Sequence, residues 1–296
     1  MILVTGGTGF IGSALVKKLS GEGKKVRLLI RPSQTSPNIP RGIQLEVAVS
    51  SLTDERGLRA ALRNVDTIYH LAGTERKGSL ADLNGVDIQG TEILSRVAKV
   101  AGVGRFIYLS HIGADRASGF PLMKAKAIAE ASIIGSGVDY TIIRSAAIFG
   151  KGDQFTEPFL RLARLEPFLF LLPGDGSALL QPLWINDLVT CLTLVNHDEE
   201  LKNQRIQIGG MEQLSFKQLL KVILSHKRMH RVLIPVSPVY LRWLTLNLEQ
   251  FAHLFPVSIF WIDYLASNHT CPLNNLTRTF GIIPARFSQT LDYLDH

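Results

Sequence analysis

A glycine-rich segment near the start of the chain, Gly6 to Gly12, most constrains what this sequence can fold into. It follows an apolar run at residues 1–4 and opens a run with apolar residues at helical spacing. Strand, glycine turn and helix in this order form the corner at which proteins bind dinucleotides. Gly6 permits a sharp turn, Gly9 leaves room for a pyrophosphate, and Gly12 lets helix and strand pack closely. Since the first N–H groups of the helix face the anion, the segment predicts a dinucleotide site.

Strand-like and helix-like patterns alternate through the first half of the chain. Short apolar runs at residues 26–30, 43–49, 66–71, 105–110 and 138–144 are separated by helical patterns, and residues 83–104 read as one long crossover helix. Such alternation favours an α/β fold, a Rossmann-type doubly wound parallel sheet, with a smaller C-terminal substrate or partner lobe. We expect a nucleotide domain at residues 1–150, to which 181–210 return, and the smaller lobe at 151–180 and 211–296. Within that lobe, residues 155–172 read as helix-like, and Ser215 is the expected N-cap of a further helix.

The residue after the second expected strand bears on the choice of dinucleotide. An acidic side chain at this point would bind the ribose hydroxyls of NAD, whereas this chain has Arg31, which suits a 2′-phosphate. NADP(H) is therefore favoured over NAD(H), with a solvated arginine as the alternative. Ser33 offers a further hydroxyl, and the proline-containing loop at residues 32–42 is expected to cover the adenosine end.

The composition limits the classes of binding partner that the protein can have, but it does not select one of them. The chain has a net charge of +7, a hydrophobic fraction of 46% and a mean hydropathy of +0.17. These values suit nucleotides or an anionic membrane surface, while the absence of an interleaved aromatic and basic motif makes nucleic acid an unlikely partner. Cys191 and Cys271 lack metal-ligand spacing, so we expect buried free thiols and no metal site. The first strand begins at Met1 and no apolar stretch reaches about 18 residues. We expect a cytoplasmic protein, with peripheral membrane attachment left open.

The sequence TGGTGFIG at residues 5–12 resembles the fingerprint of extended and atypical short-chain dehydrogenase/reductases. The segment from His70 to Gly73 resembles the family's strand-end turn beside the cofactor, and His70 is expected to be a packed histidine. Relatives place aspartate where this chain has Ser51, so the adenine contact departs from the family pattern. The resemblance and the patterns together give these expected cofactor contacts: Gly6, Thr8, Gly9, Phe10, Ile11, Gly12, Arg31, Ser33, Ser51, Leu52, Leu71, Ala72, Gly73 and Lys126.

The catalytic pattern of this family is incomplete here. The resemblance implies a serine that orients the substrate, a tyrosine that transfers the proton, and a lysine four residues later that holds the nicotinamide ribose. Ser110 and Lys126 match the serine and the lysine, but Leu122 then occupies the tyrosine position. Alignment on Lys124 instead places Phe120 there. Neither residue can donate a proton, which is what the reaction requires.

Two explanations follow from the missing tyrosine. One is a different acid or base, for which His111, Asp115 and Asp87 are the nearby candidates. The other is nucleotide binding without turnover, as in the NmrA-like regulators and the accessory subunit of respiratory complex I. The chain end, residues 263–294, resembles the complex I branch, which we therefore place ahead of the NmrA-like one.

The C-terminal region combines a basic run at residues 226–231 with tryptophan-bearing apolar stretches at 240–254 and 255–265. This combination suits an anionic membrane surface, a partner subunit or an oily substrate pocket. The sequence thus predicts an NADP(H)-binding atypical short-chain dehydrogenase/reductase with a structural, sensing or weak redox role, of the complex I accessory type. The alternative is an active oxidoreductase or epimerase/dehydratase acting on an apolar or nucleotide-linked substrate.

Overall fold

A computed structural model describes residues 1–33, 39, 42–251 and 256–295. The chain divides into two compact units. The first comprises Met1–Thr74, Asp82–Arg144 and Leu188–Ile206, and the second comprises Glu75–Ala81, Ser145–Asp187 and Gln207–His296. Parts of the expected adenosine loop (34–38 and 40–41) and of the expected apolar stretches (252–255) lie outside the described residues.

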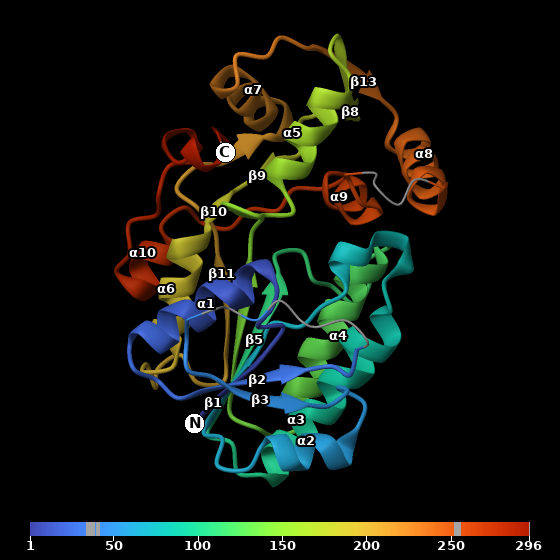
Figure 1. Ribbon diagram of the computed structural model, residues 1–296. Coiled ribbons are helices and arrows are strands. Elements are labelled where there is room, and N and C mark those ends of the chain that lie inside the picture. Colours follow the sequence, from blue (N-terminus) through green and yellow to red (C-terminus); the bar gives the residue numbers. More distant parts are fainter. Residues whose placement is uncertain (34–38, 40–41, 252–255, 296) are drawn as a thin grey trace. The chain divides into compact units, whose positions relative to one another are not determined.

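The first unit is built on a seven-stranded parallel sheet (Figure 1). Its strands are β1 (Ile2–Thr5), β2 (Val26–Ile30), β3 (Glu46–Val49), β4 (Thr67–His70), β5 (Arg105–His111), β6 (Tyr140–Ser145) and β11 (Gln204–Ile208). Their order is β11-β6-β5-β4-β1-β2-β3. The chain runs outward from β1 through β2 to β3, and then resumes on the other side of β1 with β4. The predicted doubly wound sheet is confirmed, and its switch point lies between β1 and β4, where such folds bind ligands.

Helices cover both faces of this sheet (Figure 1). α1 (Phe10–Gly21) and α6 (Ile185–Val195) lie on one face, and α2 (Glu55–Ala61), α3 (Thr91–Val100) and α4 (Pro121–Gly135) on the other. Strand alternation sorts the side chains between the faces. On β4, Ile68 packs in the core beneath α2, α3 and α4, whereas the Tyr69 hydroxyl donates to the Leu192 carbonyl oxygen of α6 at 3.0 Å.

The long helix expected over residues 83–104 is present from Leu83 to Val100, but it is not a regular α-helix throughout. The segment consists of η2 (Leu83–Gly90), which has π-type turns, followed by α3. A Cβ added to Gly90 would lie 2.8 Å from the Leu52 Cβ, so the irregular turn lets the two backbones approach closely. α3 ends before Gly102, whose positive φ of 72° breaks the helical path into β5.

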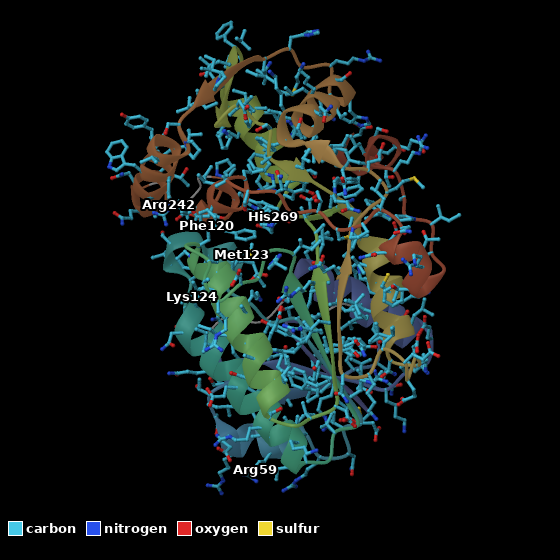
Figure 2. The ribbon with its side chains drawn as sticks, turned by 180° about the vertical axis from the view of Figure 1, so that it is seen from behind. Arg59, Phe120, Met123, Lys124, Arg242 and His269 are labelled. Atoms are coloured by element: carbon cyan, nitrogen blue, oxygen red, sulfur yellow. The ribbon has the colours of Figure 1, made fainter. Side chains whose placement is uncertain are left out.

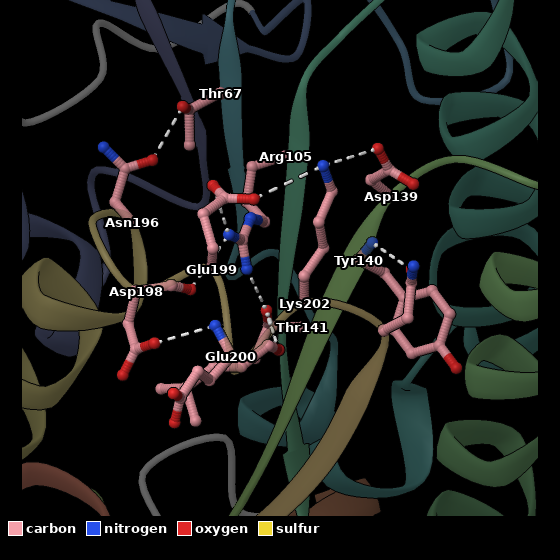
Figure 3. A network of polar contacts seen from close by, with 12 residues as sticks. Thr67, Arg105, Asp139, Tyr140, Thr141, Asn196, Asp198, Glu199, Glu200 and Lys202 are labelled. Atoms are coloured by element: carbon pink, nitrogen blue, oxygen red, sulfur yellow. Dashed lines mark hydrogen bonds and ion pairs between the residues drawn. The ribbon is translucent and has the colours of Figure 1, made fainter.

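A buried arginine joins the strands at the edge of the sheet where β5 and β6 begin (Figure 3). Arg105, only 4% exposed, donates to the Thr141 hydroxyl at 3.0 Å, the Asp198 carbonyl at 3.0 Å and the Glu199 carboxylate at 3.1 Å. Lys202 pairs with Asp139 at 3.0 Å. Because ligands of this fold bind at the opposite ends of the strands, this network stabilises the sheet without belonging to the site.

The second unit packs short helices against three small two-stranded sheets. Its elements are η1 (Glu75–Leu80), β7 (Ile148–Phe149), α5 (Thr156–Leu165), β8 (Leu169–Pro173), β9 (Leu179–Leu180), β10 (Leu183–Trp184), β12 (Leu214–Ser215), α7 (Phe216–His226), β13 (Val232–Val236), α8 (Pro238–Phe251), α9 (Ile259–Tyr264), α10 (Asn275–Phe280), η3 (Phe287–Gln289) and η4 (Asp292–Asp295). Aromatic side chains form much of its core, with Phe159 contacting Phe155, Phe216 and Trp261.

One prediction for this unit is confirmed and one is wrong. Ser215 caps α7, accepting from the Gln218 backbone N–H at 3.2 Å while the Gln218 side chain accepts from the Ser215 N–H at 2.8 Å. The helix-like reading of residues 155–172 fails at Pro167. Glu166, which precedes this proline, is held in the extended region, so α5 ends and β8 begins.

Cys191 and Cys271 are both buried free thiols, as the sequence predicted. Burial raises the pKa of the Cys271 thiol to about 11, so it is protonated at neutral pH. No helix among the described residues has both the length and the apolar character needed to cross a bilayer.

Candidate functional site

The glycine turn brings three glycines together for different steric reasons. Gly6 has a positive φ of 69°, and a Cβ there would lie 2.7 Å from the Ala72 backbone nitrogen. A Cβ on Gly12 would lie 2.2 Å from the Gly6 carbonyl oxygen, so only glycine lets α1 pack this closely. At Gly9 a Cβ would meet a single atom within 4 Å, the Gly6 oxygen at 3.3 Å. The turn is therefore packed at its two ends and open in its middle, which suits an approaching pyrophosphate.

The other expected cofactor contacts lie at the carboxyl ends of the neighbouring strands. Arg31 and Ser33 follow β2 and are exposed, as is Thr8 in the turn. Ser51 follows β3, and its hydroxyl lies 2.9 Å from the Thr53 hydroxyl. Phe10 and Ile11 begin α1 and are half-buried, as are Leu52, Leu71 and Ala72, whereas Gly73 is exposed. These groups gather at the switch point of the sheet, although their contacts with a dinucleotide stay a prediction.

His70, at the end of β4, is fully buried in a directed chain of hydrogen bonds. The Thr91 hydroxyl donates to the Asp87 carbonyl at 2.7 Å, so it accepts from His70 Nε2 at 2.8 Å. His70 Nδ1 then accepts from the Thr5 hydroxyl at 2.7 Å. Burial, together with the nearby Lys126 charge, lowers the pKa of His70 to about 3. This histidine is neutral at physiological pH and holds the strand ends together.

Lys126 lies in the interior on α4, beside a carboxylate that the sequence offered only as an alternative acid. Its ammonium is 3.2 Å from Asp87 Oδ1, and the two side chains are 3% and 0% exposed. The Thr74 hydroxyl donates to the other Asp87 oxygen at 2.5 Å. The ammonium also lies 5.5 Å from the ring centroid of Tyr108, near enough for a cation–π contact.

Ser110, at the end of β5, also faces a buried carboxylate. Its hydroxyl donates to Glu130 Oε1 at 2.6 Å. Arg144 donates two hydrogen bonds to the same carboxylate, from Nε at 2.9 Å and from a terminal nitrogen at 2.6 Å. Arg205 is 3.9 Å away. Glu130 lies one helical turn after Lys126, so α4 supplies a cation to one buried pair and an anion to the next.

The remaining residues of the expected catalytic pattern lie around the start of α4. Leu122 is buried, and its hydrocarbon side chain offers no proton. Lys124 is exposed and Phe120 is half-buried (Figure 2). Of the alternative acids and bases, Asp115 is exposed and His111 is half-buried.

A pocket of about 380 Å³ lies beside Glu130 and its partner Arg144. Charged side chains dominate its lining: Asp115, Arg116, Glu130, Arg144 and Arg205. Among the described residues that line it, none is an expected dinucleotide contact. This pocket is thus separate from the glycine turn within the first unit.

The sequence predicted no metal site, and the described residues hold one group with suitable side chains. His226, Asp292 and Asp295 bring their ligand atoms within 4.8 Å of one another. However, Asp295 Oδ1 accepts from the Lys227 ammonium at 2.9 Å, and this hydrogen bond lowers the pKa of the carboxyl group. The group is explained as an ion-paired anchor of η4.

Sequence reasoning passed over the partners that fix these side chains. Neither Glu130 nor Arg144 was among the expected site residues. A charged residue within an apolar pattern is the signal that could have found them, since charges are buried only with a partner. Asp87 within the pattern of residues 83–90 gives the same signal.

The comparisons identify the class to which this geometry belongs. The sequence model of the NAD(P)H-binding family matches residues 6–158, more than half of the chain. The protein belongs to this NAD(P)H-binding family, and the resemblance found in the glycine turn is confirmed.

Its curated relatives include a subunit of complex I. The NADH dehydrogenase 1 alpha subcomplex subunit 9 of Arabidopsis thaliana is 26% identical over 229 residues, covering 74% of this chain and 56% of that protein. Ceramide reductase of Caulobacter vibrioides is 30% identical, covering 58% of this chain and 54% of that protein. The chain thus spans just over half the length of these relatives.

Solved structures share the fold at low sequence identity. NADPH-dependent quinone oxidoreductase of Escherichia coli, in complex with NADPH, superposes with a TM-score of 0.78 at 16% identity over the whole of both chains. A nucleoside-diphosphate-sugar epimerase of Staphylococcus aureus gives a TM-score of 0.75 at 16% identity, covering 97% of this chain and 98% of that one.

Proposed function

We propose that this protein binds NADP(H) in preference to NAD(H) and lacks the proton donor of ordinary short-chain reductases. One observation carries the proposal: the polar groups expected to serve the reaction have carboxylate partners in the interior. Ser110 donates to Glu130 and Lys126 pairs with Asp87, while Leu122 occupies the tyrosine position. Side chains held in this way support the fold, and the nucleotide then has a structural, sensing or weak redox role.

The residues around the glycine turn fit a dinucleotide. The open space at Gly9 and the start of α1 suit a pyrophosphate, and the exposed Arg31 suits a 2′-phosphate. A bound nicotinamide would supply hydride chemistry. Without the tyrosine, the rate of an ordinary carbonyl reduction would be lower by roughly 10²–10⁴-fold, which is the usual contribution of a positioned acid.

Titration with NADPH and NADH tests the nucleotide preference. We expect NADPH to bind at least about tenfold more tightly, a difference of about 1.4 kcal/mol. Arg31→Glu should abolish this preference, because it places a carboxylate where the 2′-phosphate is expected. Arg56→Glu, at an exposed arginine of α2, is the matched control and should leave it unchanged. Failure of the wild-type protein to bind either nucleotide would remove the proposal.

A second candidate function is an active oxidoreductase or epimerase on an apolar or nucleotide-linked substrate. It is favoured by relatives named for lipid chemistry, such as the ceramide reductase and the 3 beta-hydroxysteroid dehydrogenase/isomerase of Mycobacterium tuberculosis, which is 32% identical over 216 residues. NADPH consumption with a panel of quinones, aldehydes, sterols and sugar nucleotides separates the two. Turnover that is lost in Lys126→Ala and kept in Lys124→Ala would establish an active enzyme. No NADPH consumption with any compound of the panel supports nucleotide binding without turnover.

The proposed role includes a partner for the second unit. The complex I subunits among the relatives support a protein complex, and the basic C-terminal region supports an anionic membrane surface. We propose a cytoplasmic location with peripheral attachment, and no role for nucleic acid.

A further inference from the structure

The second unit exposes an apolar surface on a pair of strands. β8 and β13 run parallel, with Val232 opposite Leu169 and Ile234 opposite Leu171. Val232 and Ile234 are exposed, as is Phe168 just before β8, whereas Phe170 and Leu172 point into the core. Paired residues of parallel strands share a face. One side of this strand pair is therefore aliphatic and open to solvent.

The next helix along the chain carries further exposed apolar side chains. α8 begins at Pro238, two residues after β13 ends. Val239, Tyr240 and Trp243 lie on one side of this helix and are 65–74% exposed, whereas Leu241 and Thr245, on the other side, are buried. The ion pair of Arg242 with Asp263 of α9, at 2.8 Å, fixes this orientation of α8.

Cations border this surface. Arg228 and His230 are exposed in the turn that leads into β13, and Arg164 is exposed at the end of α5. Arg231 fixes the turn in place, because its Nε donates to the Ala163 and Glu166 carbonyl oxygens at 3.0 and 2.8 Å. The exposed cations are therefore held within a few residues of Val232.

We propose that the surface formed by Phe168, Val232, Ile234, Val239, Tyr240 and Trp243 inserts into the headgroup region of an anionic lipid bilayer. Tryptophan and tyrosine favour the membrane interface, where the ring is buried and its polar atom stays hydrated. The aliphatic side chains gain by leaving water, and the bordering cations attract anionic headgroups. This inference rests on the proposed peripheral attachment and specifies the residues that would contact the membrane. It does not depend on the nucleotide site.

Flotation of the full-length protein with vesicles tests the proposal. We expect binding to vesicles of phosphatidylglycerol and phosphatidylcholine that weakens on phosphatidylcholine alone and in high salt. Phe168→Glu/Trp243→Glu should weaken it at least about tenfold, given the apolar area lost from the contact. The matched control is Val100→Glu/Ile283→Glu, which adds the same charge at two equally exposed apolar positions outside the surface and should float like the wild type.

Tryptophan fluorescence provides a second, local readout. Trp243 is 65% exposed whereas Trp261 is buried and Trp184 is half-buried. Lipids with brominated acyl chains should quench the emission, and Trp243→Phe should remove that quenching. Flotation of the Glu double variant at the wild-type level would overturn the proposal. Equal binding to neutral and to anionic vesicles would also overturn it. A dimer seen by light scattering and disrupted by the Glu double variant would do the same, because the surface would then be an interface between two copies of the chain. Titration of the variants with NADPH separates these outcomes from a failure of the nucleotide site.

Discussion

The Lys126 ammonium lies 3.2 Å from a carboxylate oxygen of Asp87, and both side chains are withdrawn from solvent. The pair joins α4 to η2 beneath the carboxyl ends of β4 and β5. A buried ion pair gains little over a hydrophobic pair, but removal of one partner leaves an uncompensated charge in the interior. The contact therefore makes the two residues depend on each other.

Lys126→Met should lower the free energy of unfolding by about 3–5 kcal/mol, because the Asp87 carboxylate loses its counter-charge. Asp87→Leu should cost a similar amount for the opposite reason. The double variant should lose much less than the sum of the two, since it contains neither charge. Urea unfolding of the four proteins measures this coupling. Additive losses would show that the pair does not act as a unit.

The Glu130 carboxylate should be worth more to stability than the Ser110 hydroxyl that it binds. Glu130→Gln leaves the Arg144 guanidinium without its charged partner, and hydrogen bonds to charged groups contribute about 1.5–3 kcal/mol each. Ser110→Ala removes a single donor and should cost about 1–3 kcal/mol.

Glu55→Gln is the matched control for this comparison in urea unfolding. Glu55 also accepts from two arginines, Arg59 and Arg96, but at the surface. Solvent screens these ion pairs, so the variant should unfold nearly as the wild type does. Equal losses from Glu55→Gln and Glu130→Gln would refute the assigned difference.

Gly12→Ala should damage both stability and nucleotide binding. The added Cβ would lie 2.2 Å from the Gly6 carbonyl oxygen, so α1 must move away from the turn. We expect a loss of about 3 kcal/mol, at the upper end of overpacking costs, and NADPH affinity reduced at least about tenfold. Gly21→Ala, at the other end of α1, meets no atom within 4 Å and should be neutral or stabilising. Thermal melts and NADPH titration of both variants check this contrast.

The sequence predicted this fold because its strongest signals are local. The glycine turn, the alternation of strand and helix patterns and the Ser215 cap depend on residues close together in the chain, and each was found correctly. The wrong boundary before Pro167 also has a local cause, but apolar patterns on either side obscured it.

The interior of the site could not be predicted in the same way. The partners of Lys126 and Ser110 are Asp87 and Glu130, 39 and 20 positions away in the chain. Pairings at such separations follow from how η2, β5 and α4 pack, and periodicity does not encode them. The sequence could name Asp87 as a nearby acid, but not as the counter-ion of Lys126.

The buried His70 should make stability fall as the pH is lowered. Its pKa is about 3 in the folded protein against 6.5 for an unperturbed histidine. Between these values the unfolded chain binds a proton that the folded protein does not, so acid favours unfolding. The contribution is fully present above pH 6.5 and declines by at most about 1.4 kcal/mol for each pH unit below it. Urea unfolding of the wild type and of His70→Asn between about pH 7.5, where the contribution is constant, and about pH 5, where it is declining, isolates the effect. The variant is less stable throughout, since it loses packing against Phe106 and Tyr108, but its stability should depend less on pH. Parallel curves for the two proteins would mean that His70 takes up a proton without unfolding, and that the hydrogen bonds from Thr5 and to Thr91 do not hold it neutral.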